Sequence, residues 1–301
     1  MPNVTIENTT VPGPHGPVPI RLYRPETGTG VGLVWLHGGG FHGGDLDVPE
    51  AHWVSGELAG AGISVVSAHY RVVSEGVHFP ILTDDVLAAW TWATTGARLG
   101  VEPGYWHLGG GSAGGNLAAS VTLQLRDACR PVPRSSVLAY PVLHDVLPPA
   151  PADLRRRVEG APIELRFPSD KCREANLNYV GDDALLSHPH AFPAHADLAG
   201  LPPTLIVTSD LDELRTSGEA YAAALAVAGV DVTLVREVDT WHGHLNEFDT
   251  AAARRTVRRM IAWLSHSDLL GEPHVPATEG APRPPLPAWV AQAGSDPTAA
   301  P

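Results

Sequence analysis

The stretch Leu108-Gly109-Gly110-Gly111-Ser112-Ala113-Gly114-Gly115-Asn116 decides the fold of this chain. Residues 110–114 match the G-x-S-x-G pattern of a nucleophile elbow, in which a strand turns so sharply into a helix that the serine backbone is strained. Glycine is needed on both sides, because a Cβ at Gly110 or Gly114 would press on the turn or on the neighbouring strand. The sequence also predicts a strand at 105–108 and a helix at 117–125. This context favours a nucleophilic Ser112 over a glycine-rich loop that merely contains a serine.

The composition of the whole chain is that of a globular protein. Its 301 residues allow one large domain or two small ones, and 44% of them are hydrophobic. The formal net charge of −13 argues against nucleic acid and anionic membranes as partners, because both need a basic surface. No apolar run is long enough to cross a membrane and no secretion signal is recognisable, so we expect a cytoplasmic protein. Cys129 and Cys172 are too few for a disulfide framework or a cysteine metal site, and we expect free thiols.

Strands and helices are expected to alternate along most of the chain. Continuous apolar runs at 31–36 and 63–68 are typical of strands buried on both faces, whereas 18–24 alternates like an edge strand. Further strands are predicted at 137–140, 203–208 and 232–238, and helices at 50–61, 84–94, 217–228 and 251–265. This alternation predicts an α/β protein with a mostly parallel central sheet and helices on both faces.

Two segments interrupt the alternation. Residues 144–198 contain a proline-rich run, the charged stretch 153–157 and a helix-like stretch at 169–179, but no further buried strand. We interpret this segment as a small cap or lid inserted over the end of the sheet, and the alternative is a surface excursion without function. After Asp268 the composition changes to proline, alanine and glycine. We therefore expect a catalytic domain at 1–268 and a tail at 269–301 that is either disordered or lies on the body as polyproline II.

The loops after two later strands carry residues that could activate a serine. A serine hydroxyl needs a base to remove its proton, and that base is usually a histidine oriented by a carboxylate. The acidic run Asp210-Leu211-Asp212-Glu213 follows the strand at 203–208, and His242 and His244 follow the strand at 232–238. Each feature alone has an ordinary explanation as a helix cap or a solvated histidine. Their order after Ser112, at the ends of two strands, predicts a Ser-His-acid triad.

A second glycine-rich stretch, His37-Gly38-Gly39-Gly40-Phe41, follows the buried strand at 31–36. Successive glycines let backbone N–H groups point at one place without an intervening side chain, as the oxyanion of an acyl-transfer intermediate requires. The N–H of Ala113, next after the nucleophile, is a further donor. A flexible turn is the alternative, but an H-G-G-G stretch together with a later G-x-S-x-G is a specific pairing.

These motifs, with Tyr70-Arg71 and the following Phe79-Pro80, resemble those of the hormone-sensitive-lipase-like esterases of the α/β-hydrolase superfamily. The similarity runs from about Val18 to Leu264. It implies an α/β-hydrolase fold and a carboxylic ester hydrolase with Ser112 as nucleophile, Asp212 as orienting acid and His242 as general base. The oxyanion donors would correspond to Gly39, Gly40 and Ala113. We expect neither a cofactor nor a metal.

Three features depart from the family pattern. The residue before the serine is usually acidic, and here it is Gly111, which removes a side chain that would brace the elbow. His244 stands where the family has phenylalanine, so a second imidazole lies two residues from the proposed base. The family usually carries helical cap residues before its first strand, whereas about seventeen residues precede Val18 here, and we expect a thin cap.

Two other functions compete with ester hydrolysis. A metal hydrolase is conceivable from the fifteen histidines and the pairs His188/His190 and His242/His244, but no H-E-x-x-H or Cys/His ligand spacing occurs. A lyase or a small-molecule-binding protein on the same fold is the stronger alternative, because fold alone does not determine function. Such relatives often lack the serine or the histidine. Since Ser112 and His242 are both present, we favour hydrolysis of a small-molecule ester.

The substrate is expected to carry a short acyl chain. The apolar residues of segment 144–198 are too few to enclose a long hydrophobic tunnel, and a chain that projects into water gains almost nothing from added methylenes. These residues are Leu154, Ile163, Leu165, Phe167, Leu177 and Tyr179. We expect an approach that tolerates a bulky alcohol portion. The natural substrate and homo-oligomerisation are left open by the sequence.

Overall fold

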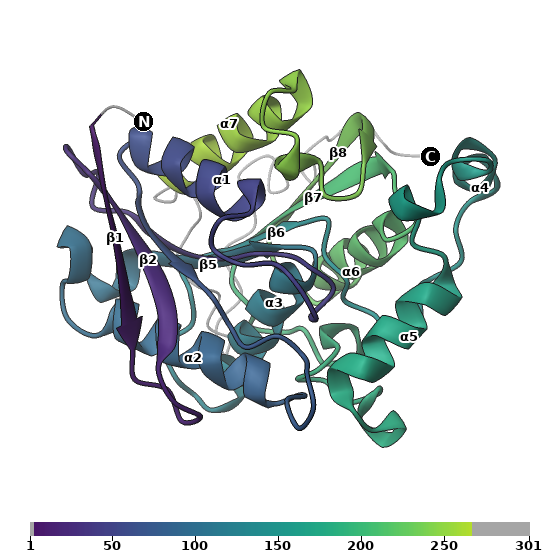
Figure 1. Cartoon of the computed structure of the whole chain (residues 1–301), viewed down its shortest axis with the longest axis horizontal. Helices are drawn as coiled ribbons and strands as arrows, with labels where there is room; N and C mark the ends of the chain where they lie inside the picture. Colours follow the sequence, from purple (N-terminus) through teal and green to yellow (C-terminus); the bar gives the residue numbers. More distant parts are fainter. Residues whose placement is uncertain (1–2, 267–301) are drawn as a thin grey trace, which may run out of the picture.

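A computed structural model describes residues 3–266 of the chain (Figure 1). The predicted tail at 269–301 and the domain end at 268 lie outside the described residues. The strands are β1 (Val4–Val11), β2 (Val18–Pro25), β3 (Gly32–Leu36), β4 (Ser64–Ala68), β5 (Trp106–Gly111), β6 (Ser136–Ala139), β7 (Thr204–Leu211) and β8 (Val232–Trp241). The α-helices are α1 (Pro49–Gly60), α2 (Ile81–Thr94), α3 (Ala113–Asp127), α4 (Ala152–Val158), α5 (Ser169–Val180), α6 (Arg215–Val227) and α7 (Ala251–Ser265). Short 3-10 helices occupy several connections, namely η1 (Arg98–Gly100), η2 (Pro103–Tyr105), η3 (Ile163–Leu165), η4 (Asp183–Leu185), η5 (Pro193–His195) and η6 (His244–Asn246).

The strands form one sheet in the order β1-β2-β4-β3-β5-β6-β7-β8. From β4 to β8 along the sheet, neighbouring strands run parallel, whereas β2 pairs antiparallel with β4 and β1 with β2. The predicted mostly parallel sheet is confirmed. Because the carboxyl ends of the parallel strands meet at one edge, the loops that follow β3, β5, β7 and β8 come together there.

Helices cover both faces of the sheet. In Figure 1, α1 and α7 lie above the sheet, and α2, α3 and α6 lie below it. The residues of β3 show how the core is divided. Leu33 and Trp35 pack in the cluster that contains the apolar residues of α1 and α7, and Val34 and Leu36 pack with those of α2 and α3. This alternation explains the continuous apolar run at 31–36, since a strand between two helix layers needs apolar side chains on both faces.

The N-terminal strand β1 is not predicted by the sequence. Its residues are mostly polar and exposed, and Val11 alone among them is fully buried. The strand lies at the edge of the sheet beyond β2, where one side has no neighbour. Such a strand lacks the alternation of apolar and polar residues on which the sequence prediction depends. Within residues 3–17, β1 pairs with β2. The same residues contain no helix that could correspond to the helical cap residues of the family.

The connection between β6 and β7 is the longest between successive strands of the described chain. It contains α4, η3, α5, η4 and η5 and no strand. In Figure 1, α4 and α5 lie on the opposite side of the molecule from β1 and β2. Leu154 of α4 and Tyr179 of α5 are fully buried, which shows that this connection packs on the body of the protein.

Two predictions from composition concern the thiols and membrane spans. Neither cysteine is in a disulfide: Cys129 is exposed and Cys172 is buried, as free thiols. None of the helices between residues 3 and 266 has both the length and the apolar character needed to span a bilayer.

Candidate active site

Ser112 lies in the turn between β5 and α3. Its backbone has φ 51° and ψ −116°, which is the strained conformation that the elbow pattern predicts. The flanking glycines are sterically required. A Cβ at Gly110 would lie 2.5 Å from the Gly114 carbonyl group, and a Cβ at Gly114 would lie 2.4 Å from the His37 carbonyl oxygen. The Ser112 N–H donates to the Ala139 carbonyl oxygen (2.9 Å), which anchors the turn at the end of β6.

Ser112, His242 and Asp212 form a continuous hydrogen-bonded chain. Ser112 Oγ lies 2.8 Å from His242 Nε2, and His242 Nδ1 lies 2.7 Å from Asp212 Oδ2. Because a carboxylate only accepts hydrogen bonds, Nδ1 carries the imidazole hydrogen and Nε2 accepts from the serine hydroxyl. Asp212 is fully buried, and its other oxygen accepts the Leu214 N–H (2.9 Å). The imidazole is therefore held in the tautomer that can take the serine proton.

The other two acidic residues of the run 210–213 have different partners: Asp210 lies at the end of β7, and Glu213 lies in the loop after it. Asp210 pairs with Arg157 of α4 (2.6 Å), and this hydrogen bond lowers the pKa of Asp210. Glu213 pairs with Arg166 (2.7 Å). Both arginines come from the connection between β6 and β7, so these two carboxylates attach that connection to the end of β7 and to the loop after it. Asp212 is the acid that the structure brings to His242.

His244, the second histidine of its loop, is bonded away from Ser112. Its Nδ1 lies 2.9 Å from Ser209 Oγ and its Nε2 lies 2.9 Å from Thr256 Oγ1. The ring is buried, and desolvation lowers the pKa of His244 to about 4, so that it is neutral at pH 7. His244 thus links β7 to α7, and both of its ring nitrogens are already engaged.

The loop after β3 places the predicted oxyanion donors. Gly39 and Gly40 both have positive φ, of 122° and 60°. A Cβ at Gly39 would lie 2.2 Å from the Gly43 carbonyl oxygen, so only glycine fits there. Within residues 3–266 the N–H groups of Gly39, Gly40 and Ala113 donate to no protein acceptor. Phe41, the next residue of the loop, stacks on Tyr179 of α5 with 4.0 Å between ring centroids.

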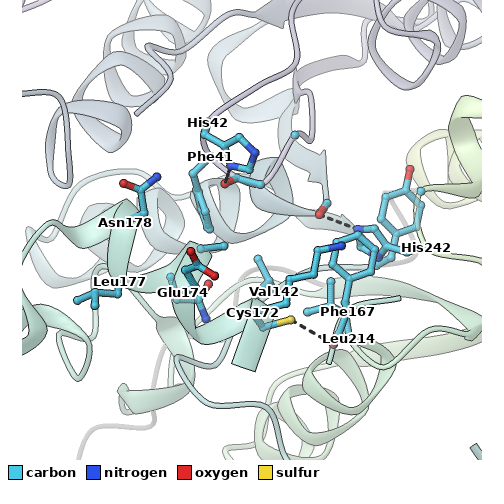
Figure 2. A pocket seen from close by; sticks show the side chains of 18 of the residues that line it. Phe41, His42, Val142, Phe167, Cys172, Glu174, Leu177, Asn178, Leu214 and His242 are labelled. Atoms are coloured by element: carbon cyan, nitrogen blue, oxygen red, sulfur yellow. Dashed lines mark hydrogen bonds between the residues drawn. The ribbon is translucent and has the colours of Figure 1, made fainter. Parts of the chain in front are cut away.

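A cavity of about 1060 Å³ adjoins Ser112 and His242. It is lined by the loop after β3, by α5 with the residue Phe167 before it, and by the loops that follow β6, β7 and β8 (Figure 2). Its apolar lining residues include Phe41, Val142, Phe167, Leu177 and Leu214. Polar and charged side chains of α5 complete the wall, among them Lys171, Glu174, Asn176 and Asn178.

The chain is similar in sequence and in fold to known proteins. The profile of a family described as alpha/beta hydrolase fold matches residues 33–246. The chain belongs to this family. The predicted fold class and the predicted resemblance to hormone-sensitive-lipase-like esterases are confirmed.

Several relatives of this α/β-hydrolase have names that describe ester hydrolysis. The chain is 35% identical over 280 residues to the carboxylesterase NlhH of Mycobacterium tuberculosis, covering 87% of this chain and 83% of NlhH. It is 34% identical over 258 residues to the carboxylic ester hydrolase LipN of the same species, covering 82% of this chain and 66% of LipN. Among solved structures, a hyperthermophilic esterase from the archaeon Pyrobaculum calidifontis is similar, with a TM-score of 0.79 and 33% identity over 88% of this chain and 84% of that chain.

The structure shows which of the six apolar residues named for segment 144–198 reach the cavity. Phe167 and Leu177 line it. The other four do not line it. Leu154 and Tyr179 are turned into the core, and Ile163 and Leu165 are exposed. In a segment without a regular hydrophobic pattern, the sequence does not tell which apolar residues face the core and which face a cavity. Phe167 also packs on His242, with 4.4 Å between ring centroids.

Two residues of this α/β-hydrolase site were not identified from the sequence. Glu50, in the first turn of α1, and Tyr140, next after β6, both line the cavity. The Tyr140 hydroxyl donates to Glu50 (2.7 Å), and the Tyr140 ring packs edge-on against His242 with 5.1 Å between centroids. In the sequence, Glu50 is an acidic residue at the start of a predicted helix, and no local pattern relates it to Ser112.

The histidine pairs considered for a metal site have other contacts. His190 pairs with Asp127 (2.7 Å), and its ring lies 5.5 Å from that of His188. Among residues 3–266 there is no cluster of three or more His, Cys, Asp or Glu side chains arranged to hold a metal ion.

Proposed function

We propose that this protein is a serine carboxylesterase that cleaves short-chain acyl esters through an acyl-enzyme on Ser112. The hydrogen-bonded chain from Ser112 through His242 to Asp212, at the edge of a cavity, carries this proposal. The relatives support it, since they are named as esterases and ester hydrolases. The chain spans 66% of the length of LipN. The esterase activity of this chain is therefore stated as a proposal.

The first half of the reaction acylates the serine. Ser112 Oγ attacks the ester carbonyl carbon while its proton passes to His242 Nε2, and the carbonyl π electrons move to the oxygen. The resulting oxyanion accepts hydrogen bonds from the N–H groups of Gly39, Gly40 and Ala113. Asp212 stabilises the imidazolium and keeps its orientation. Collapse of the intermediate breaks the bond to the alcohol oxygen, which takes the proton from His242 and leaves.

The second half releases the acid. His242 takes a proton from a water molecule, whose oxygen attacks the acyl carbon, and the same N–H donors hold the second oxyanion. Collapse breaks the bond to Ser112 Oγ, which recovers its proton from His242. Atoms balance as ester plus water giving acid plus alcohol.

The size of the acyl group follows from the limited apolar wall. We propose that residues 144–198 form a small cap on the catalytic domain. Of the six apolar residues named for this segment, Phe167 and Leu177 reach the cavity. Each methylene that contacts apolar wall is worth about 0.8 kcal/mol, so kcat/KM should rise over the first few carbons and then level off or fall. The rest of the 1060 Å³ cavity, with its polar α5 side chains, leaves room for the alcohol portion.

A p-nitrophenyl ester series from two to sixteen carbons tests this function, with the wild-type protein and Ser112→Ala side by side. We expect an optimum at short chains for the wild type and only residual turnover by Ser112→Ala. An organophosphate should add covalently to Ser112 and abolish activity. An optimum at ten carbons or more would contradict the short-chain preference, and labelling at another residue would contradict the mechanism.

The alternative of a lyase or a small-molecule-binding protein has its own signature. It predicts a labelled Ser112 without turnover of any ester in the series. The expectations of a cytoplasmic location and of no nucleic-acid or membrane partner stay predictions, and the oligomeric state stays open.

A further inference from the structure

Glu50 is a buried carboxylate beside the candidate triad, and the mechanism above does not use it. Its side chain is 4% exposed. Oε1 accepts the Gly38 N–H (2.6 Å), and Oε2 accepts the Tyr140 hydroxyl (2.7 Å). These partners are neutral donors rather than an arginine or a lysine. A buried carboxylate without a cationic partner is costly to keep, and such groups concentrate at functional sites.

The Glu50 carboxylate fills the space that a side chain before the nucleophile would need. A Cβ at Gly111 would lie 2.4 Å from Glu50 Oε2, and a Cβ at Gly38 would lie 2.4 Å from Oε1. The carboxylate therefore contacts the strand that enters the elbow and the loop that holds the oxyanion donors. Its backbone is also fixed, because Trp35 Nε1 donates to the Glu50 carbonyl oxygen (2.7 Å).

Through its two hydrogen bonds, Glu50 acts on both halves of the site. Gly38 directly precedes Gly39 and Gly40, so the bond to its N–H sets the direction of that loop. The bond to Tyr140 holds the ring that packs on His242. Burial raises the pKa of the Glu50 carboxyl, whereas the Tyr140 hydroxyl, the Gly38 N–H and the nearby His242 favour its ionised form and oppose that rise.

We propose that Glu50 is a positioning residue for this α/β-hydrolase: its carboxylate replaces the side chain that Gly111 lacks, orients the loop of Gly39 and Gly40, and stabilises the His242 imidazolium. This inference rests on the proposed serine esterase function. Helix α1 contributes none of the triad or oxyanion residues. The inference gives it a role in positioning them through Glu50.

The ionisable groups around His242 determine how its protonation should respond. Asp212 bonds to Nδ1, and the Tyr140 ring, whose hydroxyl bonds to Glu50, packs on the imidazole. His244 packs on Tyr140 and interacts electrostatically with His242. Lys171 contacts the ring of Phe167, which packs on His242. Burial lowers the pKa of His244 to about 4 and raises the pKa of Tyr140 well above its ordinary value, so both are neutral at pH 7. When Glu50 is ionised, Glu50→Gln removes a negative charge that favours the imidazolium.

The test compares Glu50→Gln with the wild type, and Glu57→Gln serves as the matched control because Glu57 is exposed on the same helix. We expect Glu50→Gln to lower kcat for p-nitrophenyl acetate by about tenfold to a hundredfold with little change in KM. The acid limb of the kcat/KM profile should move to lower pH by about half a unit to one unit, since an anion favours the protonated imidazole. Glu57→Gln should leave both unchanged.

A pair of double variants tests whether the carboxylate can be supplied from position 111. Gly111→Asp alone should lose activity, because its Cβ would meet the Glu50 carboxylate. Glu50→Ala with Gly111→Asp should recover about tenfold over Glu50→Ala, whereas Glu50→Ala with Gly111→Ala should not. Wild-type kcat and an unmoved acid limb in Glu50→Gln would overturn the proposal. So would equal activity of the two double variants, measured on proteins whose melting temperature shows that they fold.

Organophosphate labelling keeps this proposal separate from the proposed function. A wild-type protein that is labelled at Ser112 and hydrolyses esters supports the esterase whatever Glu50 does. A wild-type protein that is not labelled contradicts the esterase itself.

Discussion

Replacing His244 by phenylalanine should separate the stability of the site from its chemistry. His244 bonds to Ser209 and Thr256 and not to Ser112, which His242 contacts. Phenylalanine has a similar shape but neither donates nor accepts a hydrogen bond. The substitution therefore leaves two hydroxyls unpaired on either side of the ring.

The magnitude follows from these two hydroxyls. Ser209 and Thr256 are both fully buried, and each has His244 as the partner of its hydroxyl. Leaving a buried hydroxyl unpaired costs about 1–3 kcal/mol, so we expect the free energy of unfolding to fall by about 2–4 kcal/mol after some relaxation. A domain of this kind has about 5–15 kcal/mol in total, and the variant should remain folded at 25 °C. Its kcat should stay within about tenfold of the wild type.

The assay combines urea unfolding with steady-state kinetics on a short-chain p-nitrophenyl ester. His242→Ala is the comparator and should lower kcat by at least about a thousandfold with a much smaller loss of stability. Adding Ser209→Ala to His244→Phe should restore about 1 kcal/mol, because one unpaired hydroxyl is removed. A stability loss below about 0.5 kcal/mol, or a kcat loss beyond about a hundredfold in the folded variant, would refute the reasoning.

Two further predictions concern acid stability and the attachment of the proposed cap. Burial lowers the pKa of His37, His107 and His244 to about 4, about 3 and about 4, against about 6.5 in an unfolded chain. Between these pH values the unfolded chain binds more protons than the folded chain, so the free energy of unfolding should decrease as the pH falls from about 6.5 towards 4. The decrease should be up to about 1.4 kcal/mol per pH unit for each histidine. A urea midpoint that stays constant from pH 7 to 5 would disprove this. Arg166→Met removes the ion pair with Glu213, whose other oxygen accepts the Phe167 N–H (2.7 Å), and should lower kcat/KM by about threefold to tenfold by loosening Phe167 over His242. Arg173→Met is its control, because it removes the exposed ion pair between Arg173 of α5 and Asp183 of η4. Equal effects of the two variants would show that the ion pair between Arg166 and Glu213 has no special role.

The elbow and the oxyanion loop could be recognised in the sequence because their requirements are local. At Gly110, Gly114 and Gly39 the backbone approaches other backbone so closely that a Cβ would fall at 2.5 Å or less. Glycine at such positions leaves a pattern that five residues suffice to show. The buried parallel strands could be predicted equally well, since each needs apolar side chains on both faces. The edge strand β1 was not, because its mostly exposed residues carry no such pattern.

The contacts that join the side chains at Ser112 are made only by the tertiary structure. The order of the residues along the chain left three acids and two histidines as candidates after Ser112, and the family resemblance implied Asp212 and His242. The contacts join residues that are 30 and 130 positions apart, and their direction depends on how β7, β8 and the connection from β6 pack. The partner of Tyr140, 90 positions away at Glu50, is set in the same way by the docking of α1 on the sheet. A short motif can be recognised because its own backbone sterically requires particular residues. Which of several similar side chains takes part in the site depends on burial and on the hydrogen-bond partners that distant segments provide.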